Sequence, residues 1–188
     1  MEPGIAGPEG KRAMPVHARR FEAAPFSTSL KLISLGATAI LVAMMLLAPR
    51  AVVHQDTQLL ARAITWVLVL GPPLMIGGAL LFMVRGYELE PGALLVRRLL
   101  WATRIPLAGF ERAWHDPQAM RGSKRLFGNS GLFSITGVFR NAPLGTYRAF
   151  VTNPGQAVVI RLASRSVVVS PAESRSFIAA LEAPDAAG

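Results

Sequence analysis

The sequence predicts an α+β membrane protein in which a hairpin of two membrane-spanning helices precedes a small strand-rich domain closed by one helix. Three observations support this fold class. Two long apolar stretches without a charged residue lie in the first half of the chain. Short segments of alternating apolar and polar residues follow them. The last apolar residues of the chain then recur at the three- and four-residue spacing of a helix.

Both apolar stretches suit lipid better than water, because a charge at the bilayer centre costs roughly 2.5–3.5 kcal/mol on insertion scales. The spans are expected at about residues 30–48 and 64–84. Residues 71–73 (Gly-Pro-Pro) predict a kink in the second span, and the Gly77-Gly78 pair offers a small face for helix contact. A signal peptide is the competing interpretation of the first span, and the long polar lead and the second span argue against it.

The residues outside the spans set the expected orientation. Residues 1–29, rich in Pro, Gly and Ala, predict a disordered basic tail, and residues 184–188 a short second tail. Both outer flanks of the hairpin carry more Lys and Arg than the loop between the spans, so the positive-inside rule places both termini in the cytoplasm. The formal net charge of +9 fits a membrane protein beside anionic lipid. Nucleic acid is not an expected partner, because the basic residues are scattered.

Residues 85–183 are expected to form one domain of about seven strands. The Ser170–Glu173 segment has the pattern of a capping box with Pro171 at the first helical position, and Phe177, Ile178 and Leu181 lie on one face of the helix that follows. Residues 116–129 are expected to be a loop, and residues 131–139 an aromatic segment broken by Gly. The strands are expected at residues 87–90, 93–99, 101–106, 110–115, 146–152, 157–162 and 167–169.

Several motifs resemble the bacterial PH-like (pleckstrin-homology-like) domain family. The motifs are Tyr87–Leu89, Leu94–Arg98, Arg104–Leu107, Arg125–Phe133, Gly137–Phe139, Leu144–Thr152 and Val168–Pro171 with the final Phe177-Ile178 pair. The resemblance implies a PH-like small β-barrel or sandwich closed by one C-terminal helix. Members are non-catalytic modules that often follow two membrane spans, which implies a multi-pass protein of the bacterial inner membrane. The connection Glu90–Gly92 lacks the basic residues of phosphoinositide-binding PH domains, which argues against that ligand.

A basic loop is the candidate contact for an anionic lipid headgroup or a partner protein. Arg121, Lys124 and Arg125, with the loop glycines Gly128 and Gly131, are the candidate residues, because cations and loop amides together can hold a phosphate. The alternative is a solvated basic loop near an anionic leaflet. The aromatic residues of this region have two interpretations as well. Phe127, Phe133 and Phe139 are favoured as domain core, and an apolar groove is the alternative.

No catalytic, cofactor-binding or metal-binding residue is assigned. The chain has no cysteine, which excludes disulfides and thiolate metal sites. The domain has one histidine, His115, beside Asp116, and neither a Gly-x-Ser-x-Gly elbow nor a phosphate-binding Gly-rich loop is present. His17 and His54 lie in other parts of the chain, so the three histidines are not expected to converge on a metal.

The sequence therefore predicts a non-catalytic, membrane-anchored PH-like module. Its partners are the lipid bilayer and a cytoplasmic protein of unknown identity or anionic lipid headgroups. The alternative is an accessory subunit of a transporter or envelope-assembly complex that acts through its transmembrane hairpin.

Overall fold

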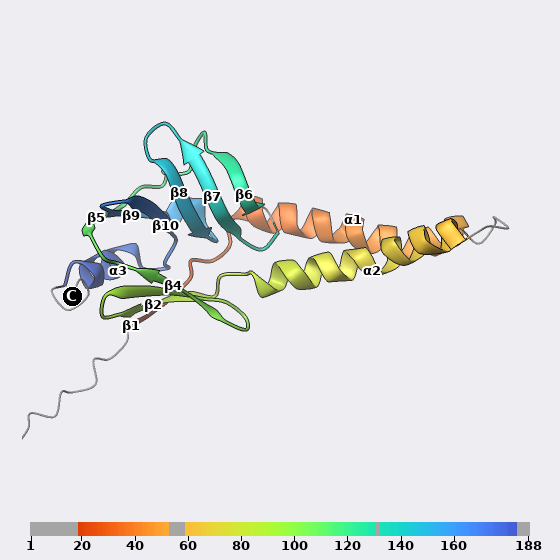
Figure 1. The fold of residues 1–188 in the computed structure, drawn as a ribbon, viewed down its shortest axis with the longest axis horizontal. Coiled ribbons are helices and arrows are strands. Elements are labelled where there is room, and N and C mark those ends of the chain that lie inside the picture. The colour runs from red at the N-terminus through yellow and green to blue at the C-terminus, as the bar shows by residue number, and fades with distance from the viewer. Residues whose placement is uncertain (1–18, 53–58, 131, 184–188) are drawn as a thin grey trace, which may run out of the picture.

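The computed structural model describes residues 19–52, 59–130 and 132–183. Two long helices, α1 (Thr28–Val52) and α2 (Leu59–Leu81), run side by side and project from a strand-rich domain (Figure 1). At 1.5 Å per residue they are about 37 and 35 Å long, enough to cross a hydrocarbon core of about 30 Å. Thr28–Leu47 and Ala63–Leu81 are the segments with the length and hydropathy of membrane spans. The two apolar helices expected from the sequence are therefore present, and their length and composition suit a membrane.

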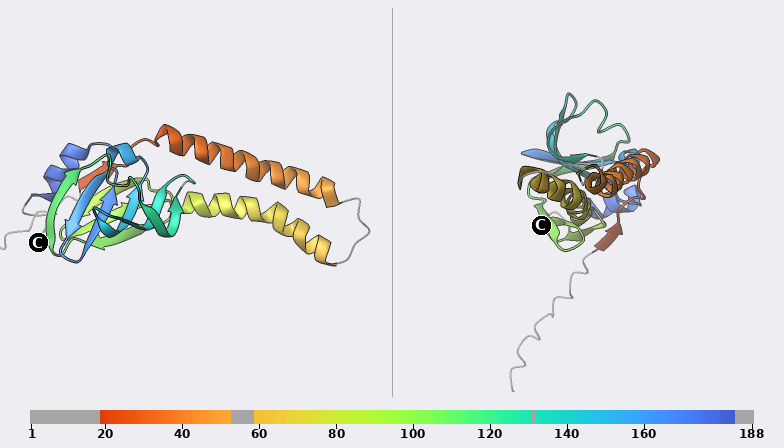
Figure 2. Two further views of the ribbon diagram at one scale, coloured as in Figure 1. Left: turned by 90° about the horizontal axis from the view of Figure 1, so that it is seen from above. Right: turned by 90° about the vertical axis from the view of Figure 1, so that its right-hand side faces the viewer.

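The helix α2 continues through Pro72 and Pro73. Figure 2 shows that it bends along its course while α1 runs straighter. Proline has no N–H to donate and its ring presses on the preceding turn, so two prolines inside a helix account for a bend. The kink expected from the sequence is thus a bend within one helix.

Two sheets and a short helix make up the domain. The first sheet is antiparallel in the order β1-β2-β3-β4, and the second has the order β5-β9-β10-β8-β7-β6, with β8 and β10 parallel. The first sheet consists of β1 (Arg19–Glu22), β2 (Gly86–Glu90), β3 (Ala93–Arg97) and β4 (Ala102–Pro106). The second consists of β5 (Phe110–His115), β6 (Lys124–Ser130), β7 (Ile135–Asn141), β8 (Gly145–Val151), β9 (Val158–Leu162) and β10 (Arg165–Val169). A 3₁₀ turn, η1 (Pro154–Gln156), and the helix α3 (Ser174–Leu181) complete the described elements.

The main core lies between the two sheets and under α3. Tyr87, Leu94, Ile160 and Phe177 are among its fully buried side chains. A second cluster around Tyr147 covers the other face of the six-stranded sheet. Strands buried on both faces read as continuous apolar runs, which explains the Val-rich sequences of β9 and β10.

A segment expected to be disordered belongs to the domain. Residues 19–22 form β1, which precedes the two helices in the sequence. This strand pairs with β2, which follows them. The amide of Ala24 donates to the Ser170 carbonyl at 2.8 Å, and Phe21 meets Phe177 edge to face with ring centroids 5.1 Å apart. The tail expected over residues 1–29 therefore does not include residues 19–29. The hairpin is inserted between β1 and β2 of one domain.

The predicted capping box is wrong. The residue before α3 is Glu173, whose side chain does not cap a backbone amide of the helix; its carboxylate accepts a hydrogen bond from the Ser176 hydroxyl at 2.9 Å. The Ser170 hydroxyl instead accepts a hydrogen bond from the Thr152 amide at 2.8 Å, and the Ser170 amide donates to the Tyr87 hydroxyl at 3.0 Å. Ser170 is fully buried, so its polar groups join strands together rather than begin the helix.

The number of strands is also higher than expected. Ten strands lie within the described residues, because β1, β6 and β7 were not predicted as strands. All of β6 except Ser130 lies in the loop expected at residues 116–129. Its glycine, Gly128, and its exposed side chains hide the alternation from the sequence, since Phe127 on this strand is exposed rather than buried. The strand is defined by its pairing with β7.

Candidate functional site

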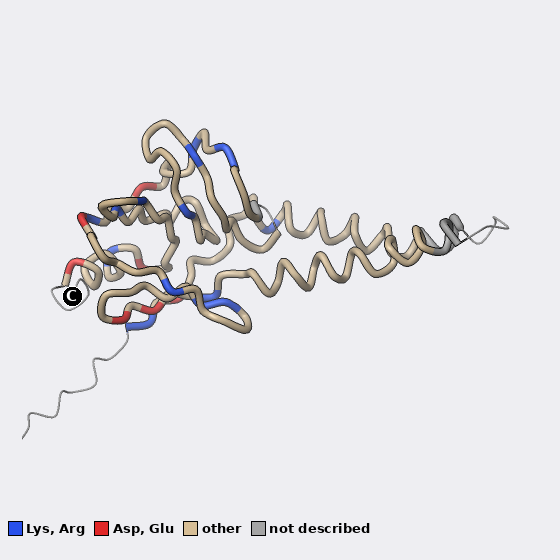
Figure 3. Tube along the Cα trace, viewed as in Figure 1, with Lys and Arg blue, Asp and Glu red and all other residues tan. Residues whose placement is uncertain are grey.

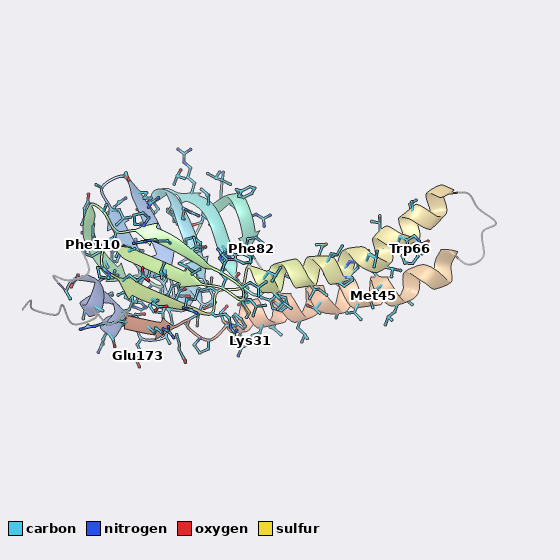
Figure 4. The ribbon with its side chains drawn as sticks, turned by 60° about the horizontal axis from the view of Figure 1, so that its bottom comes forward. Lys31, Met45, Trp66, Phe82, Phe110 and Glu173 are labelled. Carbon is cyan, nitrogen blue, oxygen red and sulfur yellow. The ribbon has the colours of Figure 1, made fainter. Side chains whose placement is uncertain are left out.

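A cavity of about 540 Å³ lies where the domain end of α2 meets the second sheet. The helix contributes Met75, Ala79 and, just past its end, Phe82. β7 and β8 contribute Thr136 and Phe150. Figure 4 shows Phe82 at the junction of the hairpin and the domain. This volume is within the range of about 300–1,000 Å³ that is typical of ligand pockets.

Two glycines shape the sheet wall of this cavity. Gly128 and Gly137 face each other on β6 and β7, with φ angles of 112° and 147°. A Cβ on Gly128 would collide with the Thr136 carbonyl oxygen, and one on Gly137 with the Phe127 carbonyl oxygen. Only glycine adopts these angles without strain. The close approach of the two strands therefore depends on glycine, and it leaves this part of the wall without side chains.

Arg98 is held at the domain end of the cavity by several contacts. Its Nη1 donates to the Phe82 carbonyl oxygen at 2.6 Å, and its Nε donates to Thr103 Oγ1 at 3.2 Å. The guanidinium carbon lies 5.3 Å from the ring centroid of Phe82, 6.0 Å from that of Trp101 and 5.5 Å from that of Phe150. Cation–π contacts of this length stabilise a guanidinium that is partly removed from water. Arg98 is thus a fixed, half-buried cation.

A second arginine lies beside it. The guanidinium carbon of Arg148 is 5.4 Å from the Phe150 ring centroid, so the two arginines share one aromatic ring. Burial lowers the pKa of Arg98, and the positive charge of Arg148 lowers it further. Within the described residues, neither guanidinium forms an ion pair with a carboxylate. Two cations next to an apolar cavity favour a bound anion, since an opposite charge relieves their repulsion.

Large apolar side chains are exposed at the same end of the domain. The turn between β3 and β4 presents Leu99, Leu100 and Trp101, and β6 presents Leu126 and Phe127. Leu100 is 74% exposed and Phe127 79%. Figure 1 shows the β3–β4 loop and the end of β6 near the base of the hairpin. Such exposed apolar groups mark an interaction surface, and a bilayer crossed by the hairpin would begin beside them.

The predicted basic loop forms a separate group. Arg121 precedes β6 and donates to Gln118 Oε1 at 3.0 Å, while Lys124 and Arg125 begin β6. Lys124 lies opposite Arg140 on β7. Figure 3 shows these basic segments at one edge of the domain.

Only part of the predicted site comes together in the structure. Arg121 and Arg125 line a second cavity of about 560 Å³, whereas Gly128 lines the first cavity instead. Gly131 lies outside the described residues. A role for these five residues in binding stays a prediction.

The three phenylalanines expected to form core have different environments. Phe139 is buried in the second core cluster, as expected. Phe127 instead lines the first cavity, and Phe133 has a φ of 58° in the connection between β6 and β7. Arg98 and Arg148 were not predicted from the sequence as site residues. Arg98 had one signal that could have revealed it, because it precedes the apolar turn Leu99–Trp101 directly.

The histidine and aspartate that the sequence places side by side, His115 and Asp116, lie at the end of β5 and in the turn that follows. No group of three His, Cys, Asp or Glu side chains in the described ranges is placed to hold a metal ion. The carboxylate of Asp116 accepts a hydrogen bond from the Gln118 amide at 2.8 Å, and His115 is exposed at the end of β5. This hydrogen bond closes a turn of the kind that Asp commonly stabilises.

The fold and the site together define a class of protein: a two-sheet domain attached to a hairpin of two helices that are long and apolar enough to span a membrane, with its apolar and basic surface at the base of the hairpin. A comparison with protein families matches residues 85–184 to the bacterial PH domain. The match covers more than half of the chain, so the chain belongs to the bacterial PH domain family. No curated protein and no solved structure gives a match.

Proposed function

We propose that this protein is a non-catalytic module that binds anionic lipid with the bilayer-facing end of its PH-like domain. The observation that carries the proposal is the set of exposed apolar side chains, Leu100 and Phe127 among them, beside Arg98 and Arg148 at the base of the hairpin. Apolar side chains favour the acyl boundary, while arginines favour the phosphates just outside it. Membership of a family of binding modules supports the absence of catalysis.

We further propose that the protein lies in the bacterial inner membrane with both termini in the cytoplasm. The pairing of β1 with β2 brings both ends of the hairpin to one domain, so both ends share one side of a membrane that the hairpin crosses. The more basic outer flanks then favour the cytoplasmic side. A reporter that is active only outside the cytoplasm, fused after Gly188, is expected to give no signal.

The basic group of Arg121, Lys124 and Arg125 is proposed as a second contact, with headgroups or with an acidic segment of a partner protein. Each basic residue near an anionic leaflet contributes roughly 1 kcal/mol of attraction. The triple change to alanine is expected to weaken association of the domain with anionic bilayers. An unchanged association would remove these residues from the proposal.

The absence of cysteine allows a direct test with single nitroxide labels. The full chain carrying Leu100→Cys is labelled and placed in nanodiscs of phosphatidylcholine, with and without phosphatidylglycerol. We expect oxygen to reach the label more readily than a water-soluble nickel complex does. This difference in accessibility is expected to be larger in nanodiscs that contain phosphatidylglycerol. Ala179→Cys is the matched control, because Ala179 is exposed on α3, away from the hairpin (Figure 1). Equal, water-like accessibility at both positions would contradict the proposal.

An accessory role of the hairpin remains the second candidate. Gly77 and Gly78 on α2 have open space where a Cβ would lie, so another helix could approach closely there. Replacing the hairpin by an unrelated two-helix anchor separates the candidates. If the domain carries the function, its contact with lipid survives the exchange. If the hairpin carries the function, co-purification of a membrane complex is lost.

A further inference from the structure

The first cavity continues from the membrane-spanning part of α2 into the domain. Met75 lies within the span Ala63–Leu81, and Phe82 lies directly after it. Along a helix these two residues are about 10 Å apart. One end of the cavity is therefore at the depth of acyl chains, and the other end, with Arg98 and Arg148, is on the domain side of the span.

The wall chemistry changes along the same direction. The α2 wall has Met75, Gly78 and Ala79, none of which carries a polar side chain. The domain wall has the two guanidiniums, with Thr136 as a further polar residue. Among the residues that the structure describes, no acidic one lines the cavity. This arrangement complements a molecule with an apolar tail and an anionic head.

From this complementarity we propose that the cavity binds one anionic glycerophospholipid. Arg98 and Arg148 hold its phosphate, and one acyl chain lies against Met75, Ala79 and Phe150. The proposal rests on the proposed function and deepens it, because it replaces general attraction to a leaflet with one discrete site. The Phe82 carbonyl and the aromatic rings fix Arg98 before a ligand arrives, and a fixed cation loses less freedom on binding.

Substitution of Arg148 tests the headgroup half of the site. Arg148 is exposed, with its guanidinium over Phe150 on the strand, so Arg148→Gln is expected to leave the fold intact. Arg112→Gln is its matched control, because Arg112 is also an exposed strand arginine over an aromatic ring, 4.7 Å from the Trp114 centroid, and does not line the cavity. Both variants remove one positive charge from an exposed strand arginine. They differ in whether that arginine lines the cavity.

Substitution of a glycine tests the acyl half. Gly78 lines the cavity and has open space at its Cβ, so Gly78→Leu is expected to fill the apolar end without changing charge. Gly77 has the same open space and does not line the cavity. Gly77→Leu is therefore the matched control for helix propensity and bulk.

The measurement is native mass spectrometry of the full chain released from nanodiscs of phosphatidylcholine with a minor fraction of phosphatidylglycerol. We expect the native chain to retain one phosphatidylglycerol in excess of its share of the bilayer. Arg148→Gln and Gly78→Leu are expected to lower this retention about tenfold, as for the loss of about 1.4 kcal/mol, while Arg112→Gln and Gly77→Leu retain it. Equal loss in Arg148→Gln and Arg112→Gln, or no enrichment in the native chain, would overturn the proposal.

The nitroxide label at position 100 keeps this test separate from that of the proposed function. A buried label without retained lipid would refute the discrete site and leave surface binding in place. A water-accessible label without retained lipid would refute both.

Discussion

The Tyr87 hydroxyl joins the two sheets of the domain, and its removal gives the sharpest test of the fold. The hydroxyl donates to the Phe150 carbonyl oxygen on β8 at 2.6 Å and accepts from the Ser170 amide at 3.0 Å. Tyr87 is fully buried, so water cannot replace these bonds. Tyr87→Phe leaves the Ser170 amide without its partner, and an unpaired buried donor costs about 1–3 kcal/mol.

The expected result is a lower unfolding temperature of the full chain. For a domain of roughly a hundred residues, 1 kcal/mol corresponds to a shift of about 4–8 °C, so the midpoint should fall by at least about 4 °C. Thermal unfolding followed by near-ultraviolet circular dichroism in detergent measures this shift. An unchanged midpoint would refute the reasoning that the hydroxyl links the sheets.

The other tyrosine of the chain provides the control. The Tyr147 hydroxyl lies 2.6 Å from Ser123 Oγ, and that oxygen also accepts from Asn141 Nδ2 at 3.1 Å. Tyr147→Phe deletes the same atom but leaves Ser123 with a partner. Its effect is expected to be under about 1 kcal/mol, the net value of an ordinary hydrogen bond.

The same hydroxyl predicts a dependence on alkaline pH. Burial raises the pKa of Tyr87 to about 12, whereas the unfolded side chain titrates near 10. Above about pH 10 the unfolded chain releases a proton that the folded chain retains, so stability falls as the pH rises. The loss is about 1.4 kcal/mol per pH unit until the folded pKa is reached. Tyr87→Phe should have a shallower decline between pH 10 and 12 than the native chain, and parallel declines would contradict the assignment.

Two further predictions concern β1 and the cavity wall. Hydrogen bonds from Arg97 and Arg20 lower the pKa of Glu88, against the effect of its burial. The lowered pKa means that the charged carboxylate stabilises the folded chain. This stabilisation is present above the unfolded pKa near 4.3 and is lost as the pH falls through the folded pKa. Glu88→Gln should therefore speed tryptic cleavage at Arg20 at pH 7, and an unchanged cleavage rate would show that the ion pairs do not hold β1. Gly128→Ala should lower the unfolding midpoint strongly, because its Cβ would collide with the β7 backbone. Gly122→Ala, with open space and a φ of 67°, should cost only about 1 kcal/mol, and equal effects of the two glycine changes would contradict the close approach of β6 and β7.

The sequence was most informative where one local pattern determines the structure. The two apolar helices follow from hydropathy alone, and β5 was predicted with its observed bounds, Phe110–His115. β1 could not be predicted, since four residues with an exposed surface carry no clear period. They form a strand only because β2 presents a free edge and Phe177 a partner for Phe21.

The two arginines beside the first cavity were not predicted from the sequence for a related reason. Clusters of basic residues in one stretch, such as Arg121 to Arg125, are visible in a sequence. Arg98 lies just after β3 and Arg148 lies on β8, fifty residues further along the chain, and they meet through the ring of Phe150. Ser170 shows the same limit, because its capping pattern was overridden by a buried amide of Thr152 that needed a partner.

The insertion of the hairpin between β1 and β2 changes what affinity the proposed lipid site needs. A domain on one flexible linker can tilt away from the bilayer, whereas this domain is connected to both ends of the hairpin. Ser34 on α1 also accepts a hydrogen bond from the Phe133 amide at 3.0 Å, which joins the helix to the β6–β7 connection. In the proposed arrangement the cavity is therefore held next to the lipid, and binding requires no further loss of overall translation by the protein. Weak intrinsic affinity is then sufficient for occupancy, and the fraction of anionic lipid in the leaflet controls it. Retained phosphatidylglycerol should rise and saturate as that fraction is increased, whereas a strictly linear rise would indicate only general attraction to the surface.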